Sequence, residues 1–226
     1  MFDRFELLIG DKINNVKGKT VLILGLGGVG SYACESLVRS GVESIIVVDN
    51  DIIDITNLNR QLMTNMSNIG MYKVDVWYDR IKSINPNCNI IKIKEFIEET
   101  NIDILFNNKV DYVIDACDTI DTKVLLIEKC IKDNIKIISC MGTGNKMNPS
   151  LLKITDISKT SYDKLAKIIR KKLREKNINH VMVVSSDEVG YTDIHKTIPS
   201  NSFVPATAGL LLTSYVINDI VGDKDV

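Results

Sequence analysis

Residues 21–30 read VLILGLGGVG, and this stretch decides the fold class. Its first part is an unbroken apolar run, which is typical of a strand buried on both faces of a parallel sheet. The rest has the spacing G-x-G-x-x-G, made by Gly25, Gly27 and Gly30, with Gly28 as a further glycine. Such glycines let the backbone turn tightly and approach a phosphate, and the helix expected after them offers free N–H groups. The stretch therefore predicts a Rossmann-like unit that binds a nucleotide.

The carboxylate of Asp49 extends this prediction. A second apolar run, residues 44–48, is expected to form the next strand, and Asp49 ends it. In nucleotide-binding units an acidic residue at this place commonly bonds the ribose hydroxyls. The alternative is a tight turn whose glycines serve only packing, and the glycine motif alone would favour a nicotinamide dinucleotide over ATP.

Strand and helix signals alternate along the chain, which indicates an α/β fold: a Rossmann-like doubly wound, mostly parallel sheet with a C-terminal α/β extension. We expect a single domain over residues 1–226, with a nucleotide-binding core at 1–140 and a substrate-side part at 141–226. The expected strands are 21–24, 44–48, 90–93, 112–116, 136–140, 152–154 and 181–184. The expected helices are 31–40, 71–84, 101–106, 122–131, 162–176 and 205–220.

The composition is that of a soluble globular protein, with 226 residues, 45% hydrophobic residues and a formal net charge of -1. This charge predicts no partner, so affinity for nucleic acid would come from a local patch. The short, charged N-terminus is not a signal peptide, and polar residues interrupt the apolar stretch 204–221. We therefore expect a cytoplasmic protein without a membrane span.

The five cysteines suggest neither a metal clip nor a disulfide framework. No two of them are spaced as C-x-x-C, and their number is odd. The positions expected in the core are Cys34, Cys117, Cys130 and Cys140. Cys88 is the candidate for an exposed thiol, although no base stands near it in the sequence.

Two further features favour ATP over a dinucleotide. The polar motif NLNRQ at 57–61 supplies Asn57 and Arg60, and Lys73 follows it. Arginine can bind a triphosphate in bidentate fashion, and lysine acts as a point charge. Asp118 comes just after the expected strand 112–116, where a carboxylate can hold the Mg²⁺ that accompanies ATP. The alternatives are solvated surface charges in the loop and simple helix capping by Asp118.

This set of residues resembles the ubiquitin-activating-like (ThiF/MoeB) superfamily, whose simplest bacterial members adenylate sulfur-carrier proteins. The matching positions are Gly25 to Gly30, Asp49, Asn57 to Gln61, Lys73 and Asp118. The resemblance implies that Asp49 binds ribose and that Asn57, Arg60 and Lys73 bind the phosphates. It further implies that Asp118 holds Mg²⁺ or positions the reacting phosphate. Finally, it implies a homodimer in which Arg4 reaches the phosphates of the partner.

Three segments of the C-terminal third are distinctive: residues 142–149 (GTGNKMNP), 156–160 (DISKT) and 202–206 (SFVPA). They resemble the tRNA threonylcarbamoyladenosine dehydratase branch of this superfamily. The resemblance implies that ATP activates the carboxylate of a threonylcarbamoyl group beside the tRNA anticodon, after which the group closes on itself and AMP leaves. Ring closure is intramolecular, so no protein thioester is required. Whether a monovalent cation joins the ATP site, and which sulfur-transfer partner protein takes part, if any, stays open.

The expected helix 162–176 carries a basic stripe at helical spacing. The stripe consists of Lys164, Lys167, Lys171 and Arg174. The residues expected on its apolar side are Leu165, Ile168, Ile169 and Leu173. Such a helix can offer its charges to tRNA phosphates, or it can simply be a solvated amphipathic helix.

The two histidines have no metal-ligand company in the sequence. His180 precedes an expected strand and is expected to be structural. His195 lies in the polar loop 185–202, which could cover the active site or be merely disordered.

The favoured interpretation is an ATP-dependent tRNA-modifying dehydratase. The runner-up is an adenylating activator of a small sulfur-carrier protein, and the missing C-x-x-C clips count against it. A nicotinamide-dependent oxidoreductase and a catalytically silent nucleotide sensor are further alternatives. The joint presence of Arg60, Lys73 and Asp118 counts against both of these.

Overall fold

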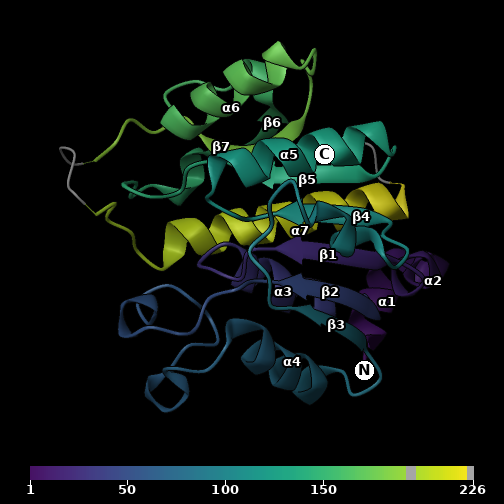
Figure 1. Ribbon diagram of the computed structural model, residues 1–226. Coiled ribbons are helices and arrows are strands. Elements are labelled where there is room, and N and C mark those ends of the chain that lie inside the picture. Colours follow the sequence, from purple (N-terminus) through teal and green to yellow (C-terminus); the bar gives the residue numbers. More distant parts are fainter. Residues whose placement is uncertain (192–196, 223–226) are drawn as a thin grey trace.

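The computed structural model describes residues 1–191 and 197–222, and Figure 1 shows a sheet with helices on both faces. The sheet has seven strands in the order β3-β2-β1-β4-β5-β7-β6. Their bounds are β1 Thr20–Leu24, β2 Ser44–Val48, β3 Asn89–Ile93, β4 Tyr112–Asp115, β5 Lys136–Cys140, β6 Leu152–Asp156 and β7 Met182–Ser186. Neighbouring strands are parallel except β6 and β7, which are antiparallel. The predicted doubly wound α/β fold is confirmed.

The α-helices of the described chain lie before β1, after β7 and in four of the six connections between strands. Their bounds are α1 Asp3–Ile9, α2 Ile13–Lys17, α3 Gly30–Arg39, α4 Lys73–Ile84, α5 Ile120–Lys132, α6 Lys164–Glu175 and α7 Phe203–Val221. Short 3₁₀ turns cover Gly10–Lys12, Ile55–Asn57, Met66–Asn68, Ile102–Phe106, Pro149–Leu151 and Ile157–Lys159. The helices α1 and α2 are additional to the predicted ones, because helices this short carry little periodic signal.

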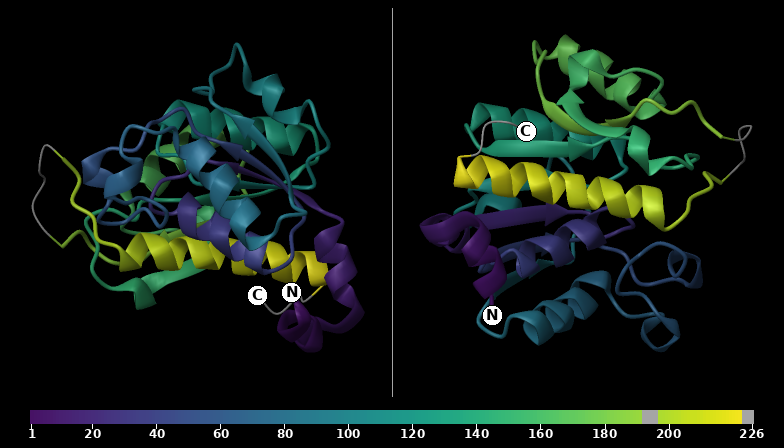
Figure 2. Two further views of the ribbon diagram at one scale, coloured as in Figure 1. Left: turned by 90° about the horizontal axis from the view of Figure 1, so that it is seen from below. Right: turned by 180° about the vertical axis from the view of Figure 1, so that it is seen from behind.

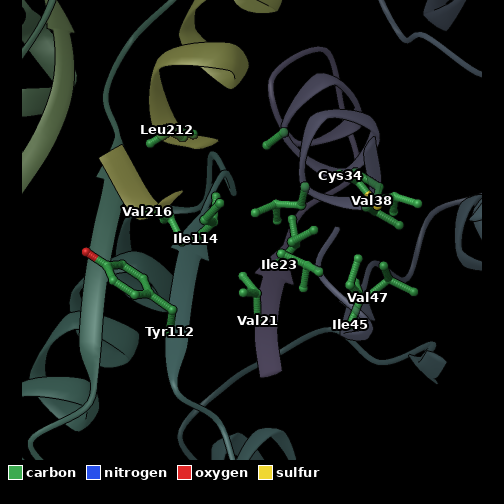
Figure 3. Close-up of a cluster of buried hydrophobic side chains, with 14 of the residues drawn as sticks. Val21, Ile23, Cys34, Val38, Ile45, Val47, Tyr112, Ile114, Leu212 and Val216 are labelled. Carbon is green, nitrogen blue, oxygen red and sulfur yellow. The ribbon is translucent and has the colours of Figure 1, made fainter. Parts of the chain in front are cut away.

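Each central strand supplies two cores, because successive side chains of a strand point to opposite faces. From β1, Val21 and Ile23 join the core that contains α3 and α7, and Leu22 joins the one that contains α5. Figure 3 shows part of the first core, where Val21 and Ile23 lie near Ile114 of β4. Burial on both faces explains why the strand is an unbroken apolar run.

The last helix, α7, crosses one face of the sheet beside α3 (Figure 2). The two helices come close at Gly209, where a Cβ would lie 2.3 Å from the carbonyl oxygen of Val29. By length and composition α7 could cross a membrane, but 50% of its apolar window is buried inside the protein. This burial is what a core helix shows. The helix begins at Phe203, so Pro205 lies in its first turn, where a missing N–H is tolerated.

Several predicted boundaries were wrong by one or two residues. Helix α6 begins at Lys164 instead of 162, because the Asp163 carboxylate accepts a 2.9 Å hydrogen bond from the N–H of Ala166 and caps the helix. Helix α4 begins at Lys73 instead of 71. Pairing with β6 carries β7 on to Ser186. The helix predicted at 101–106 is a 3₁₀ turn.

The order of the strands locates the ligand-binding edge. From β1 the chain builds β2 and β3 on one side and then returns to place β4 and β5 on the other. The direction of the strand order therefore reverses between β1 and β4. In open α/β sheets the carboxyl ends of the strands at such a reversal form the crevice that holds the ligand.

Candidate active site

The glycine loop, residues 25–30, lies at this reversal point, directly after β1. Gly25 has a φ of +88°, and a Cβ on it would lie 2.8 Å from the carbonyl oxygen of Ala116. A Cβ on Gly30 would lie only 1.8 Å from the carbonyl oxygen of Gly25. Glycine is therefore required at both positions, so that the loop can press against the end of β4 and lead into α3.

Asp49 follows β2 and ties the glycine loop to that strand. Its Oδ2 accepts a 2.7 Å hydrogen bond from the N–H of Leu26, and its Oδ1 accepts a 2.9 Å bond from the N–H of Asp51. The side chain is buried, and this burial raises the pKa of Asp49 against the opposing influence of Lys73. The structure thus brings Asp49 and the glycine loop together, while the role of Asp49 on ribose stays a prediction.

Lys73 lies beside the same carboxylate. Its Nζ is 2.7 Å from Oδ2 of Asp51 and 3.7 Å from Oδ2 of Asp49. Only 4% of the residue is exposed, and its N–H donates a 3.0 Å hydrogen bond to the carbonyl oxygen of Asp51. A buried ammonium group held by two carboxylates stands close to the glycine loop.

Arg60 covers the glycine loop with its aliphatic stem. A Cβ on Gly28 would lie 3.1 Å from Cγ of Arg60 and 3.2 Å from Cβ of Pro205 in α7. The guanidinium group donates hydrogen bonds of 2.9 Å to the carbonyl oxygen of Thr56 and to Oδ1 of Asn59. The cation predicted for the phosphates therefore does lie at the loop.

Asn57 and Gln61, which share the motif of Arg60, make different contacts from one another. Oδ1 of Asn57 accepts a 3.1 Å hydrogen bond from the N–H of Asp54 and closes a 3₁₀ turn, so Asn57 stabilises its own loop. Gln61 is 5% exposed, and its Nε2 would lie 3.9 Å from a Cβ on Gly27. Its buried Oε1 has no hydrogen-bond partner within the described residues. No role was predicted for Gln61 from the sequence, and its side-chain amide lies beside the loop with this oxygen unpaired.

Asp118 is exposed on the turn between β4 and α5. The helix cap is at Thr119 and has no side-chain capping bond, so simple capping by Asp118 is not what the structure shows. Oδ1 of Asp115 fixes the turn by accepting a 3.2 Å hydrogen bond from the N–H of Cys117. Among the described residues no group of three or more His, Cys, Asp or Glu side chains gathers to hold a metal ion.

The same turn rests on a buried polar cluster that the sequence analysis missed. Nζ of Lys123 donates to Oδ2 of Asp115 at 2.7 Å and to Oγ of Ser139 at 3.1 Å. Oγ of Ser139 in turn donates to Oδ2 of Asp115 at 2.6 Å. The sequence did contain a signal for this cluster: Asp115 is a charged residue at the end of an apolar strand, and Lys123 lies on the helix that follows.

Arg4 does not lie with the other predicted site residues of its own chain. It belongs to α1, which Figure 1 places by the amino end of β1, opposite to the glycine loop. Phe2 is 3.6 Å from the position of a Cβ on Gly41, which precedes β2, in agreement with this placement. If Arg4 acts at a site, that site belongs to another copy.

The thiol predicted to be exposed is buried. Cys88 is 0% exposed, and burial raises its pKa to about 11. Cys117 was expected in the core but is partly exposed, although burial still raises its pKa well above the usual value. The predictions for the other three are confirmed, since Cys34, Cys130 and Cys140 are all buried.

The basic stripe of α6 faces solvent, and the other side of the helix packs on α5. All four basic residues of the stripe are exposed, and none forms an ion pair with another described residue; they are Lys164, Lys167, Lys171 and Arg174. The apolar side differs at one position from the prediction. Ile168 is 42% exposed, and Ala166 joins Ile169 and Leu173 in the core instead.

Two segments of the C-terminal part, residues 145–146 and 199–201, are joined by hydrogen bonds. The N–H of Asn145 donates a 2.7 Å bond to the carbonyl oxygen of Pro199, and Nδ2 of Asn201 donates one of 2.7 Å to the carbonyl oxygen of Lys146. His180 is mostly exposed, with Nδ1 3.2 Å from Oδ2 of Asp156. His195 and part of the loop 185–202 lie outside the described residues.

A family model and the sequences of known proteins both point to one family. The model of the ThiF family matches residues 4–222. The tRNA threonylcarbamoyladenosine dehydratase of Bacillus subtilis is 43% identical, with 100% of this chain and 96% of that protein covered. The enzyme of the same name from Haemophilus influenzae is 38% identical and aligns with 75% of this chain and 65% of its own length.

Solved structures agree. The Escherichia coli tRNA N6-threonylcarbamoyladenosine dehydratase in complex with AMP matches with a TM-score of 0.93 and 29% identity, over 98% of this chain and 94% of that chain. The same E. coli protein in complex with ATP matches with a TM-score of 0.92, over 98% and 93% of the two chains.

Proposed function

The chain belongs to the ThiF family, and we propose that it is an ATP-dependent tRNA threonylcarbamoyladenosine dehydratase. The substrate carboxylate attacks the α-phosphorus of ATP, which yields an acyl-adenylate and pyrophosphate. A nucleophile within the same threonylcarbamoyl group then attacks the activated carbonyl carbon and expels AMP. The net change in the nucleoside is the loss of one water. Adenylation suits this purpose because AMP is a far better leaving group than carboxylate oxygen, and ring closure within one group has a high effective molarity.

One observation carries the proposal: the glycine loop, Asp49, Lys73 and Arg60 meet at the carboxyl ends of β1 and β2. In our assignment the backbone at Gly25, Gly27, Gly28 and Gly30 cradles phosphate. Asp49 accepts hydrogen bonds from the ribose hydroxyls, while Arg60 and Lys73 offset the charge of the phosphates, with Asn57 shaping the loop between them. For Lys73 this means exchanging Asp51 for a phosphate oxygen.

Asp118 is our candidate for the Mg²⁺ that accompanies ATP. It is an exposed carboxylate at the carboxyl end of β4, one strand from the glycine loop. Mg²⁺ is usually held by one or two carboxylates together with substrate phosphates, so a single protein carboxylate fits that chemistry. The ion would offset phosphate charge, and Asp118 would orient it. A monovalent cation would be a further addition to this site.

A homodimer would complete the site. The exposed face of α1 includes Leu7 at 88% and Leu8 at 77%, which is unusual for a face that only water covers. Pairing through α1 would cover these side chains and carry Arg4 of one chain toward the phosphates of the other. We take the chain of 226 residues as one adenylating domain.

The tRNA would lie along α6, whose unpaired basic stripe is suited to a phosphate backbone. The substrate-side segment 141–226 would place the modified adenosine at the adenylate. We place the enzyme in the cytoplasm with its tRNA substrate and treat α7 as a core helix.

The decisive experiment supplies ATP to the purified protein with tRNA that carries threonylcarbamoyladenosine, and with the same tRNA lacking the modification. AMP release that requires the modified tRNA, together with a nucleoside lighter by one water in mass spectrometry, is the expected result. AMP release independent of tRNA would reject this substrate. Adenylation of a small carrier protein ending in diglycine would then establish the runner-up.

A further inference from the structure

Tyr162 is held in an unusual backbone conformation at the head of the basic helix. Its φ is +60°, and the N–H of Asp163 donates a 2.8 Å hydrogen bond to the carbonyl oxygen of Ser161. This bond closes a three-residue turn around Tyr162. Turns of this kind with positive φ are rare and strained, and a bulky residue with positive φ is an outlier.

Both neighbours of Tyr162 are anchored, which keeps the turn in place. Oγ of Ser161 donates a 3.1 Å hydrogen bond to Oδ1 of Asp187. The Asp163 carboxylate is 6% exposed and accepts 2.9 Å hydrogen bonds from the N–H groups of Gly142 and Ala166. The surroundings therefore hold the backbone at Tyr162 in this conformation, and such over-determined backbone strain is found most often at functional sites.

The ring itself is turned outward. Tyr162 is 70% exposed, and its hydroxyl has no hydrogen-bond partner among the described residues. An aromatic side chain that packed for stability would be covered, and a turn that served only the chain path would favour glycine or asparagine at this φ. Neither explanation accounts for a strained, exposed tyrosine.

Tyr162 also lies between two parts of the proposed substrate path. On one side Asp163 connects it to Gly142, which follows β5 at the edge of the sheet that holds the site. β5 is two strands from β1, which corresponds to about 10 Å across the sheet. On the other side the exposed stripe of α6 begins at Lys164 and extends for about 15 Å to Arg174.

We propose that the Tyr162 ring is a stacking platform for an unpaired base of the tRNA, next to a phosphate track formed by the basic stripe of α6. This inference rests on the proposed function and names a contact that would position its substrate. Single-stranded loops of RNA are recognised by stacking of splayed bases on aromatic side chains, and cations beside the ring bind the adjoining backbone. Because the backbone that carries the ring is already held in place, the segment needs little ordering when the base arrives.

The test measures KM for threonylcarbamoyladenosine-containing tRNA and KM for ATP in four proteins. Tyr162→Ala removes the ring, and Tyr162→Phe keeps it without the hydroxyl. Phe96→Ala is the matched control, since Phe96 is 50% exposed and lines a groove of about 530 Å³ away from Tyr162, in which carboxylates such as Glu98 and Glu99 outnumber the lysines. We expect Tyr162→Ala to raise KM for tRNA by about 5- to 100-fold, without changing KM for ATP. Tyr162→Phe and Phe96→Ala should both stay within about twofold of wild type, because a stacked ring does not need its hydroxyl.

The dependence of tRNA affinity on salt concentration distinguishes base stacking on Tyr162 from charge contacts to the tRNA phosphates. Lys167→Ala should flatten the dependence of tRNA affinity on salt concentration, whereas Tyr162→Ala should weaken affinity at every salt concentration and leave the slope unchanged. Tyr162→Gly repeats the loss of the ring in a residue that adopts positive φ freely, so a result caused by misfolding would not recur. An unchanged KM for tRNA in Tyr162→Ala, or a Tyr162→Phe protein as impaired as Tyr162→Ala, overturns the stacking inference while the dehydratase assignment stands. A wild-type protein that does not convert the modified tRNA overturns both.

Discussion

The Lys123 ammonium lies 2.7 Å from the Asp115 carboxylate, and neither side chain has any exposed surface. Burial opposes the charge of Lys123, but the attraction of Asp115 prevails and raises the pKa of Lys123. The pair stands directly beneath the turn that carries Asp118, because Asp115 also accepts the N–H of Cys117. A buried pair of this kind costs much free energy to break and little to replace as a whole.

Breaking this pair should destabilise the protein strongly. Lys123→Met leaves a buried carboxylate without its partner, and we expect the free energy of unfolding in denaturant to fall by about 3–5 kcal/mol. The double variant Lys123→Met with Asp115→Asn should lose much less than the sum of the two single losses. The control is Lys136→Met, which removes an exposed pair with Asp219 and should cost about 0–1 kcal/mol. Equal losses at the two lysines would contradict the prediction.

Two glycines of the loop should respond differently to alanine. A Cβ on Gly30 would collide with the carbonyl oxygen of Gly25 at 1.8 Å, so Gly30→Ala should lower the thermal midpoint and abolish ATP binding. The nearest neighbour of a Cβ on Gly27, beyond the adjacent residues, would be Nε2 of Gln61 at 3.9 Å, so Gly27→Ala should fold normally. The variant should nevertheless bind ATP more weakly, because the added methyl group enters the space that a phosphate needs. Calorimetric unfolding and ATP titration of the two variants check this prediction. If Gly27→Ala bound ATP with wild-type affinity, the glycine loop would not be the phosphate-binding element.

Nucleotide binding should depend on the protonation of Asp49. Burial raises the pKa of Asp49, so the folded protein holds this proton to a higher pH than the unfolded chain does. The contribution of Asp49 to stability is therefore complete below its unfolded pKa and declines as pH rises through the folded pKa. The affinity for nucleotide should depend on pH in the opposite direction, because the ribose hydroxyls need the ionised carboxylate as acceptor. This affinity should fall as pH falls through the folded pKa of Asp49.

Adenosine is the suitable probe for this effect, because it has no phosphate that titrates near neutral pH. Its affinity should decrease on acidification in the wild type. In Lys73→Met the midpoint should move to higher pH, since the positive charge that favours the Asp49 carboxylate is gone. An adenosine affinity that is flat with pH in both proteins would show that Asp49 does not bond the ribose.

No thiol of this protein should become acylated during turnover. Burial raises the pKa of Cys88 to about 11 and that of Cys130 and Cys140 to about 12, and it raises those of Cys34 and Cys117 well above their usual value. A thiol, unlike a thiolate, is a weak nucleophile. Cys88→Ser and Cys117→Ser should therefore keep turnover within about twofold of wild type. Mass spectrometry of the protein quenched during turnover tests this directly, and a thioester on either cysteine would revive the carrier-protein interpretation.

Arg4 should act on the site of a partner chain. Arg4→Ala and Arg60→Ala should each be inactive alone, whereas unfolding and refolding them together should restore about a quarter of the wild-type activity. The reason is that each mixed dimer contains one site with both arginines intact. Leu7→Asp with Leu8→Asp should dissociate the dimer in analytical ultracentrifugation and abolish activity. Mixtures that stay inactive would place Arg4 outside the catalytic machinery.

The sequence alone was sufficient for features that depend on neighbouring residues. The apolar run 21–24, the glycines after it and Asp49 predicted a buried strand, a tight turn and a nearby carboxylate, and all three are present. The basic stripe of α6 was predicted from helical spacing and is exposed. Such features follow from local backbone geometry and from the period of the hydrophobic pattern, both of which are written in short stretches of sequence.

Only the tertiary structure decided which distant residues meet. Cys88 is buried because it lies where α4 returns to β3, and no local pattern marks that place. The pairing of Lys123 with Asp115 requires α5 to lie over the ends of β4 and β5, and the bond from Gly142 to Asp163 requires α6 to lie beside β5. Whether Arg4 meets a phosphate depends on a second chain. These contacts are set by the order of the strands and by the packing of helices on them, which are long-range properties that the period of a sequence does not contain.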